Sequence, residues 1–219
     1  MGMPREDKSV EEERISFEVK GARIEGFLST DEPPPKGAII ICHPHPLFGG
    51  TMDNGVVVEI ARIAAMWDFA SLRFNFRGVG GSTGQFGGGI GEQEDVKGAI
   101  DYLAERKKPP VIVLAGYSFG AIACLPVGAK DERVGGLIGV APPLDMFDFG
   151  FLTDSSKPKL FVCGDRDTIC TPSKMEDFFK NLLGPKWLRI LPGVDHFFYD
   201  RRGLLEGAVG DFLERMAQP

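Results

Sequence analysis

One segment constrains the fold of this chain more than any other. Residues 111–115 form an unbroken apolar run, which predicts a strand buried on both faces of a sheet. The run leads into Gly116-Tyr117-Ser118-Phe119-Gly120 and then into small residues that suit a helix. A side chain at either glycine would clash with the neighbouring strand or helix, so the turn is expected to be tight and strained. We therefore expect the Ser118 hydroxyl to project alone from the top of the sheet.

Strands and helices alternate along the rest of the chain. Residues 15–19 and 22–29 alternate apolar and polar side chains around Lys20-Gly21, which predicts an antiparallel hairpin at a sheet edge. The later alternation predicts a mostly parallel sheet with helices on both faces, an α/β fold. Strands are expected at 37–43, 69–76, 111–115, 134–141, 158–163 and 186–191, and helices at 54–66, 92–107, after Ser118, at 172–183 and at 204–216.

No repeat or linker divides the chain. Residues 15–219 predict a single domain, and the highly charged residues 1–14 predict a flexible N-terminal tail rather than a secretory signal. The glycine-rich residues 78–91 predict a long flexible loop. This loop invites a phosphate-binding interpretation, but Thr83 replaces the required glycine and no Gly-Lys-Ser/Thr follows. Arg77, at its start, is expected to hold the loop rather than an anionic substrate.

The composition excludes several classes of protein. The formal net charge of -6 argues against nucleic acid as a partner, because phosphate contacts need a basic surface. The apolar runs have the length of strands, so we expect no membrane partner. None of the cysteines forms a Cys-x-x-Cys pair, and a disulfide framework is not expected in a chain with this much core. We therefore predict a cytoplasmic location with free thiols at Cys42, Cys124, Cys163 and Cys170.

The chemistry is expected at the carboxyl ends of the strands, where open α/β sheets form their sites. Ser118 follows one strand, Asp165 and Asp167 follow the next but one, and His196 follows the last. A serine hydroxyl needs an adjacent base to act as a nucleophile, and the base needs an acid to orient it. The order serine, aspartate, histidine along the chain therefore predicts a catalytic triad of Ser118, an aspartate and His196.

At these positions the chain resembles the α/β-hydrolases, over nearly the whole core of that fold. More narrowly, it is similar to compact bacterial serine hydrolases related to dienelactone hydrolase. The likeness rests on His43-Pro44-His45-Pro46-Leu47-Phe48-Gly49-Gly50-Thr51-Met52, Arg73-Phe74-Asn75-Phe76-Arg77-Gly78-Val79-Gly80 and Gly116-Tyr117-Ser118-Phe119-Gly120. Ser118 replaces the cysteine nucleophile of dienelactone hydrolase itself, which argues against a dienelactone substrate. The resemblance implies an α/β-hydrolase fold and no cofactor, and it allows a homodimer.

The resemblance also favours one acid. The family's acid usually follows a glycine by three residues and precedes a proline, and Gly164-x-x-Asp167 with Pro172 fits this spacing. Asp165 is then expected to stabilise its loop. Asp145 stays open as a third choice, since some α/β-hydrolases place their acid after the preceding strand. Asp195 adjoins His196 in sequence and is expected to serve a turn.

An oxyanion hole needs fixed backbone N–H donors. Phe119, which follows the nucleophile, is one expected donor. The other should come from the loop 43–50, in which Pro44 and Pro46 have no N–H, so His45 and Leu47 are the near candidates. The family's loop favours His45. A metal site at His43 and His45 is the competing interpretation, but no third ligand is evident, and we expect no metal.

These residues predict a serine hydrolase of carboxylesterase type that acts on a small-molecule acyl substrate. A thioesterase, peptidase or acyltransferase would use the same groups, and a catalytically idle binding or scaffold protein is the alternative from another class. Residues 142–157 are too short for a cap domain, so the site is expected to be open. Aromatic residues near the strand ends are candidates for an apolar substrate pocket, namely Phe48, Tyr117 and Phe197.

Overall fold

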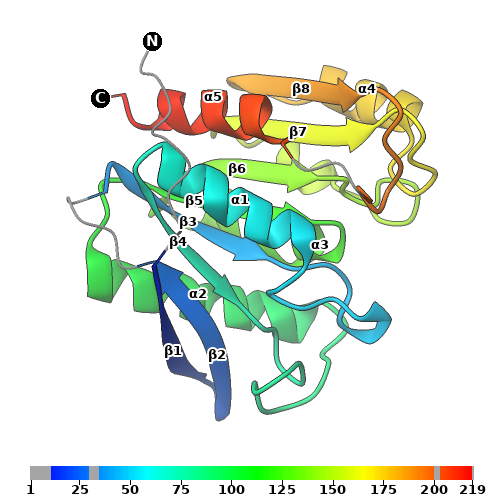
Figure 1. The fold of residues 1–219 in the computed structure, drawn as a ribbon. Helices are drawn as coiled ribbons and strands as arrows, with labels where there is room; N and C mark the ends of the chain where they lie inside the picture. Colours follow the sequence, from blue (N-terminus) through cyan, green and yellow to red (C-terminus); the bar gives the residue numbers. More distant parts are fainter. Residues whose placement is uncertain (1–10, 30–34, 200–202, 219) are drawn as a thin grey trace.

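The computed structural model describes residues 11–29, 35–199 and 203–218 of the chain. These residues form one eight-stranded sheet with helices on both of its faces (Figure 1). The strands are β1 (Glu12–Val19), β2 (Ala22–Ser29), β3 (Gly37–Cys42), β4 (Phe69–Phe74), β5 (Ile112–Tyr117), β6 (Val134–Val140), β7 (Lys159–Gly164) and β8 (Lys186–Leu191).

The strand order in the sheet is β1-β2-β4-β3-β5-β6-β7-β8. The first two strands form the predicted antiparallel hairpin, and β2 also pairs antiparallel with β4. From β4 through β3, β5, β6 and β7 to β8, each pair of neighbouring strands is parallel. Because β3 and β5 are buried along their whole length, they read as continuous apolar runs rather than alternating ones. The equally buried β4 and β7 include the polar or charged residues Ser71, Arg73 and Lys159. The predicted α/β fold, mostly parallel with an N-terminal antiparallel hairpin, is confirmed.

Five helices cover the sheet within the described residues, namely α1 (Gly55–Met66), α2 (Ile90–Lys107), α3 (Phe119–Lys130), α4 (Pro172–Lys180) and α5 (Glu206–Met216). Figure 1 shows α1 and α5 in front of the sheet, where they pack on each other, and α2 and α3 together behind it. The fourth helix packs against β7 through Phe178, whose ring meets that of Phe161. This arrangement encloses one continuous apolar core between the two helical layers and the sheet.

The first strand begins three residues earlier than predicted. Glu12 and Glu13, assigned to the N-terminal tail from the sequence, belong to β1. Their charge is compensated, because Glu12 forms a paired hydrogen bond with Arg73 of β4 and Glu13 lies 3.3 Å from Arg106 of α2. The part of the predicted tail at residues 1–10 lies outside the described residues.

Several helix ends also differ from the prediction, among them the start of α1 at Gly55 and of α5 at Glu206, and two of the differences have a visible cause. The second helix begins at Ile90 rather than at residue 92, because Glu92 accepts hydrogen bonds from the N–H groups of the preceding turn. The fourth helix ends at Lys180 rather than at residue 183. There the Lys186 ammonium donates to the carbonyls of the last two helical residues and to that of Leu182 just beyond them, which closes the helix early.

The segment between β6 and β7 stays short. It contains only a single-turn helix, η2 (Gly150–Leu152), so no cap domain stands over the carboxyl ends of the strands. A transmembrane helix is likewise absent from the described residues, since none of their helices combines the required length with the required hydrophobicity.

Candidate active site

The turn after β5 has the strained geometry expected from its sequence. Ser118 has φ 51° and ψ -115°, a conformation that side chains rarely adopt. A Cβ at Gly116 would meet the backbone of Ala121, and one at Gly120 would meet the carbonyl oxygen of Cys42 at the end of β3. Only glycine fits at these two positions. The Ser118 hydroxyl is left partly exposed beyond the carboxyl end of β5.

Three side chains that are far apart in the sequence meet at this turn. Ser118 Oγ lies 2.9 Å from His196 Nε2. On the other side of the ring, His196 Nδ1 lies 2.9 Å from Asp167 Oδ2 and 3.1 Å from Asp167 Oδ1. An ionised carboxylate only accepts hydrogen bonds, so the imidazole proton belongs on Nδ1. The other ring nitrogen, Nε2, is then free to accept the hydroxyl proton of Ser118.

The four aspartates considered as the acid have different surroundings. Asp167 is buried, and its Oδ1 also accepts the N–H groups of Ile169 and Cys170, which fixes the carboxylate against the ring. The other three accept backbone N–H groups of loops and turns instead of facing the His196 ring. Asp165 holds the turn after β8, Asp145 holds the residue before α4 and also pairs with a lysine of that helix, and Asp195 caps its own turn.

Tyr117 does not line the mouth of the site, in contrast to the pocket role predicted for it. Its side chain is only 3% exposed, and its hydroxyl donates to the backbone carbonyl of His196 over 2.8 Å. Burial raises the pKa of this hydroxyl far above its usual range, so it stays a donor. No pattern in the sequence signals this contact, because all six residues of β5 are buried and Tyr117 does not stand out among them. The other two pocket candidates, Phe48 and Phe197, are exposed.

The two candidate oxyanion donors in the 43–50 loop differ in whether their N–H groups are already engaged. The N–H of Leu47 donates to His45 Nδ1, which caps the single-turn helix η1 (Pro46–Phe48). The N–H groups of His45 and Phe119 donate to no residue in the described part of the chain. The rings of these two residues lie 4.8 Å apart, centroid to centroid. The N–H groups of His45 and Phe119, which remain as candidate oxyanion donors, therefore lie on neighbouring segments beside Ser118.

His43 has a structural environment. It is fully buried at the end of β3, with Nδ1 2.7 Å from the Pro44 carbonyl and Nε2 accepting the N–H of Phe76 over 3.1 Å. Burial lowers its pKa from 6.5 to about 4, although the bond to Pro44 opposes this change. Both ring nitrogens are thus occupied. Among residues 11–29, 35–199 and 203–218, no group of three or more His, Cys, Asp or Glu side chains is arranged to bind a metal.

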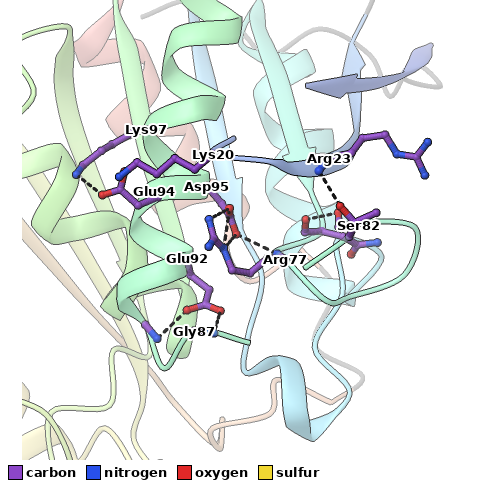
Figure 2. A network of polar contacts seen from close by, with 12 residues as sticks. Lys20, Arg23, Arg77, Ser82, Gly87, Glu92, Glu94, Asp95 and Lys97 are labelled. Carbon is purple, nitrogen blue, oxygen red and sulfur yellow. Dashed lines mark hydrogen bonds and ion pairs between the residues drawn. The ribbon is translucent and has the colours of Figure 1, made fainter. Parts of the chain in front are cut away.

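The glycine-rich loop after β4 is anchored at several points. Figure 2 shows Arg77 against Asp95 of α2, with bonds of 2.7 to 3.1 Å, and Glu92 beside the backbone of the loop. Glu92 accepts the N–H groups of Gly87 and Gly89 at 2.8 and 2.7 Å. The loop is therefore anchored to α2, in contrast to the flexible loop expected from its glycines. These contacts also show that Arg77 holds the loop, as expected.

Phe86, which this loop carries toward the site, has no direct signal in the sequence. Its ring packs on the rings of His45 and Phe119, with centroids 5.2 and 5.7 Å away. The only available signal was indirect. Glu92 stands three residues after Gly89, the spacing by which a carboxylate caps the start of a helix and so fixes the preceding turn.

Comparison with known proteins finds relatives that align with most of the chain. An uncharacterized protein of Rickettsia prowazekii is 31% identical over 209 residues, which cover 91% of this chain and 88% of that protein. No protein-family model matches the sequence.

Three solved structures share both the fold and more than 30% of the sequence. An α/β serine hydrolase homologue from Coxiella burnetii is 35% identical, with a TM-score of 0.82 over 91% of this chain and 96% of its own. A putative α/β hydrolase from Agrobacterium tumefaciens is 32% identical, with a TM-score of 0.86 over 93% and 95%. A lidless α/β serine hydrolase from Xanthomonas campestris is 31% identical, with a TM-score of 0.84 over 95% and 96%. The narrower likeness to dienelactone hydrolase stays a prediction. The chain belongs to the family of α/β serine hydrolases without a lid.

Proposed function

We propose that this protein hydrolyses carboxylic esters through an acyl-enzyme on Ser118. The observation that carries the proposal is the continuous line of hydrogen bonds from Ser118 Oγ through His196 to Asp167. A serine alone is a poor nucleophile, and this arrangement supplies both the base and the group that orients it. The partly exposed hydroxyl stands at a strand end with no cap above it, where a substrate carbonyl has access.

In the proposed first step, Ser118 Oγ attacks the ester carbonyl carbon while its proton passes to His196 Nε2. The imidazolium that forms is stabilised by Asp167, which is buried and already bound to Nδ1–H. When the tetrahedral intermediate collapses, the C–O bond to the alcohol breaks and Nε2 returns the proton to the leaving oxygen. Water then attacks the acyl-enzyme by the same path in reverse, which releases the carboxylic acid and restores the Ser118 hydroxyl.

The negative charge on the carbonyl oxygen is assigned to the N–H groups of His45 and Phe119. A preorganised pair of backbone donors typically contributes about 3 kcal/mol per donor to the transition state. Leu47 is set aside as a donor because its N–H is engaged by the His45 ring. The close contact of Gly120 with the Cys42 carbonyl supports this assignment, since it brings the loop after β3 against the start of α3.

An active-site-directed probe tests the proposal. A fluorophosphonate should label the folded protein, and Ser118→Ala should abolish the labelling. Absence of labelling in the folded wild type would favour the idle binding or scaffold alternative. Single-turnover acylation by p-nitrophenyl butyrate and by butyryl thioesters then separates an esterase from a thioesterase, and an unactivated amide tests for a peptidase.

The proposed acid has a matched control two residues away. Asp167→Asn leaves the geometry in place but removes the charge and favours the wrong tautomer of His196, so kcat should fall by about 10⁴-fold. Asp165→Asn removes a carboxylate of the same loop that only binds a backbone N–H, and its kcat should stay within about threefold of wild type. The reverse pattern would assign the acid to Asp165.

We also propose a cytoplasmic location. The four cysteines, Cys42, Cys124, Cys163 and Cys170, are all free and buried. Buried thiols that form no disulfide suit a reducing compartment. Fractionation of cells that express a tagged protein tests this proposal, and recovery in an extracellular or membrane fraction would contradict it.

A further inference from the structure

Two groups of aromatic side chains flank Ser118 on opposite sides of β5. The loops after β3 and β4 carry Phe48 and Phe86, and both strands lie on one side of β5 in the sheet. The loop after β8 carries Phe197 and Tyr199, and β8 lies on the other side. In the described part of the chain, no ring contact joins the two groups.

The group on the β3 side forms a connected surface, which we name the aromatic cluster: His45, Phe48, Phe86 and Phe119. The His45 ring lies at its centre, 4.8 Å from the Phe48 ring and 5.2 Å from the Phe86 ring. Phe119 is buried beneath, whereas Phe48 is 86% exposed. An exposed phenylalanine beside a buried one leaves an apolar, flat surface open to a ligand.

The part of this surface formed by Phe86 and His45 is held in place before any ligand arrives. Phe86 belongs to the glycine-rich loop, which Arg77, Glu92 and Asp95 fix to α2 (Figure 2). His45 is fixed from its other edge, because its Nδ1 accepts the N–H of Leu47. Since these two rings need little further ordering on binding, they retain more of their contact energy for the ligand.

The cluster offers little to a charged group. Burial lowers the pKa of His45, although Glu92 opposes this effect, so the ring is neutral near pH 7. The nearby guanidinium of Arg77 is engaged by Asp95, and the fully buried Glu92 is engaged by backbone N–H groups. A carboxylate on the substrate would therefore lose its water without gaining a free cation.

The chemistry of the proposed reaction decides which half of the ester lies here. The leaving oxygen must come within hydrogen-bond distance of His196 Nε2 to receive its proton. The alcohol half therefore extends toward the β8 side, past Phe197, whose ring centroid lies 5.7 Å from that of His196. The acyl half is then directed away from His196, toward the loops after β3 and β4.

We propose that the aromatic cluster is the acyl subsite, and that it accepts uncharged acyl groups that carry an aromatic ring. This inference rests on the proposed function. The ring of the acyl group stacks on Phe48 and lies over the edge of the cluster, beside the oxyanion donors. A short aliphatic acyl group reaches the donors but not Phe48, and an acyl group with a free carboxylate is disfavoured.

The test holds the alcohol constant and varies the acyl group. The substrates are p-nitrophenyl acetate, hexanoate, 3-phenylpropanoate and hemisuccinate. For the wild type, kcat/KM should be highest for 3-phenylpropanoate. It should be lower for hemisuccinate, which carries a free carboxylate, than the length of its acyl chain alone would give among the uncharged esters. Phe48→Ala and Phe48→Leu should lower kcat/KM for 3-phenylpropanoate by about threefold to tenfold, the usual worth of an aromatic pair, and change acetate by less than about twofold.

The matched control is Phe151→Ala, which removes an exposed phenylalanine from the segment after β6. Its kcat/KM values should match wild type for every substrate. Phe48 is exposed, so its replacement should leave the fold intact, and unchanged circular dichroism checks this. An equal loss for acetate and 3-phenylpropanoate overturns the proposal. The proposal is also overturned if the Phe48 variants instead lose activity in a series of acetate esters whose alcohols vary, because Phe48 would then contact the alcohol half.

Fluorophosphonate labelling keeps this inference separable from the proposed function. The probe reports whether Ser118 is nucleophilic, and it does so without an acyl group. Labelling that is intact in all variants, combined with no acyl preference, refutes the subsite and leaves the hydrolase standing. Absence of labelling in the wild type refutes the proposed function itself.

Discussion

His43 should make the stability of this protein depend on pH in the mildly acidic range. Its ring joins the end of β3 to the end of β4, because Nδ1–H donates to the Pro44 carbonyl and Nε2 accepts the N–H of Phe76. A proton on Nε2 would abolish the second bond and place a charge in a fully buried ring. The folded protein therefore resists protonation of His43, whereas the unfolded chain does not.

The expected magnitude follows from the two pKa values. The pKa of His43 falls from 6.5 to about 4 on folding, chiefly because of burial. Above pH 6.5 neither state binds the proton, so the full stability is present. As the pH falls from 6.5 toward 4 the unfolded state alone gains a proton, and stability is lost. The loss amounts to about 2.5 kcal/mol by pH 4.5, with a slope near 1 kcal/mol per pH unit at about pH 5.

The assay compares wild type with His43→Gln, which keeps polar atoms at the position but does not titrate. Urea unfolding, followed by the fluorescence of Trp67 and Trp187, gives the free energy of unfolding of both proteins between about pH 7.5 and pH 4.5. Other titrating groups, including His45, are common to both proteins and cancel in the difference. The wild type should lose about 2.5 kcal/mol more than the variant as the pH falls. Parallel curves would refute the lowered pKa assigned to the buried His43 ring.

Three further changes test the frame of the site. Gly120→Ala should destabilise the protein by at least about 2 kcal/mol and abolish fluorophosphonate labelling, since its Cβ meets the carbonyl at the end of β3; a stable, labelled variant would contradict the packing. Tyr117→Phe removes the donor to the His196 carbonyl and should lower kcat by about tenfold with KM unchanged; a rise in KM alone would place Tyr117 in substrate binding. Asp95→Asn breaks the buried pair with Arg77 and should lower the unfolding free energy by about 3 kcal/mol, read by urea unfolding; a change below about 1 kcal/mol would show that the pair does not anchor the loop.

The order of elements was predictable from sequence because each strand and helix carries its own local signal. The buried strands are apolar along their length, and the helices carry stripes of apolar residues with polar turns between them. The positions of Ser118, Asp167 and His196 followed from topology, since residues after parallel strands gather at one edge. Their hydrogen-bond distances did not follow, because these depend on how loops from β5, β7 and β8 pack.

What escaped prediction depends on contacts between distant segments. The turn position of Tyr117 suggested a pocket, but its direction is set by the backbone of residue 196, which is 79 residues away. Phe86 stood in a run of glycines that offered no periodicity, and its place is set by Glu92 and Asp95 on α2. Glu12 and Glu13 looked like part of a charged tail, but their backbone pairs with Ser29 and Leu28 of β2, and arginines of β4 and α2 compensate their charge.

The position of β5 between the two halves of the sheet divides the site into parts that can change separately. The side chains proposed to move the proton lie at the ends of β5, β7 and β8, whereas the proposed acyl subsite is built from the loops after β3 and β4 and the first residue of α3. Grafting residues 46–50 together with 78–91 from a relative, with the proposed oxyanion donor His45 kept in place, should therefore transfer substrate preference without disturbing the reactivity of Ser118. For protein engineering, this makes the β3–β4 edge an exchangeable module.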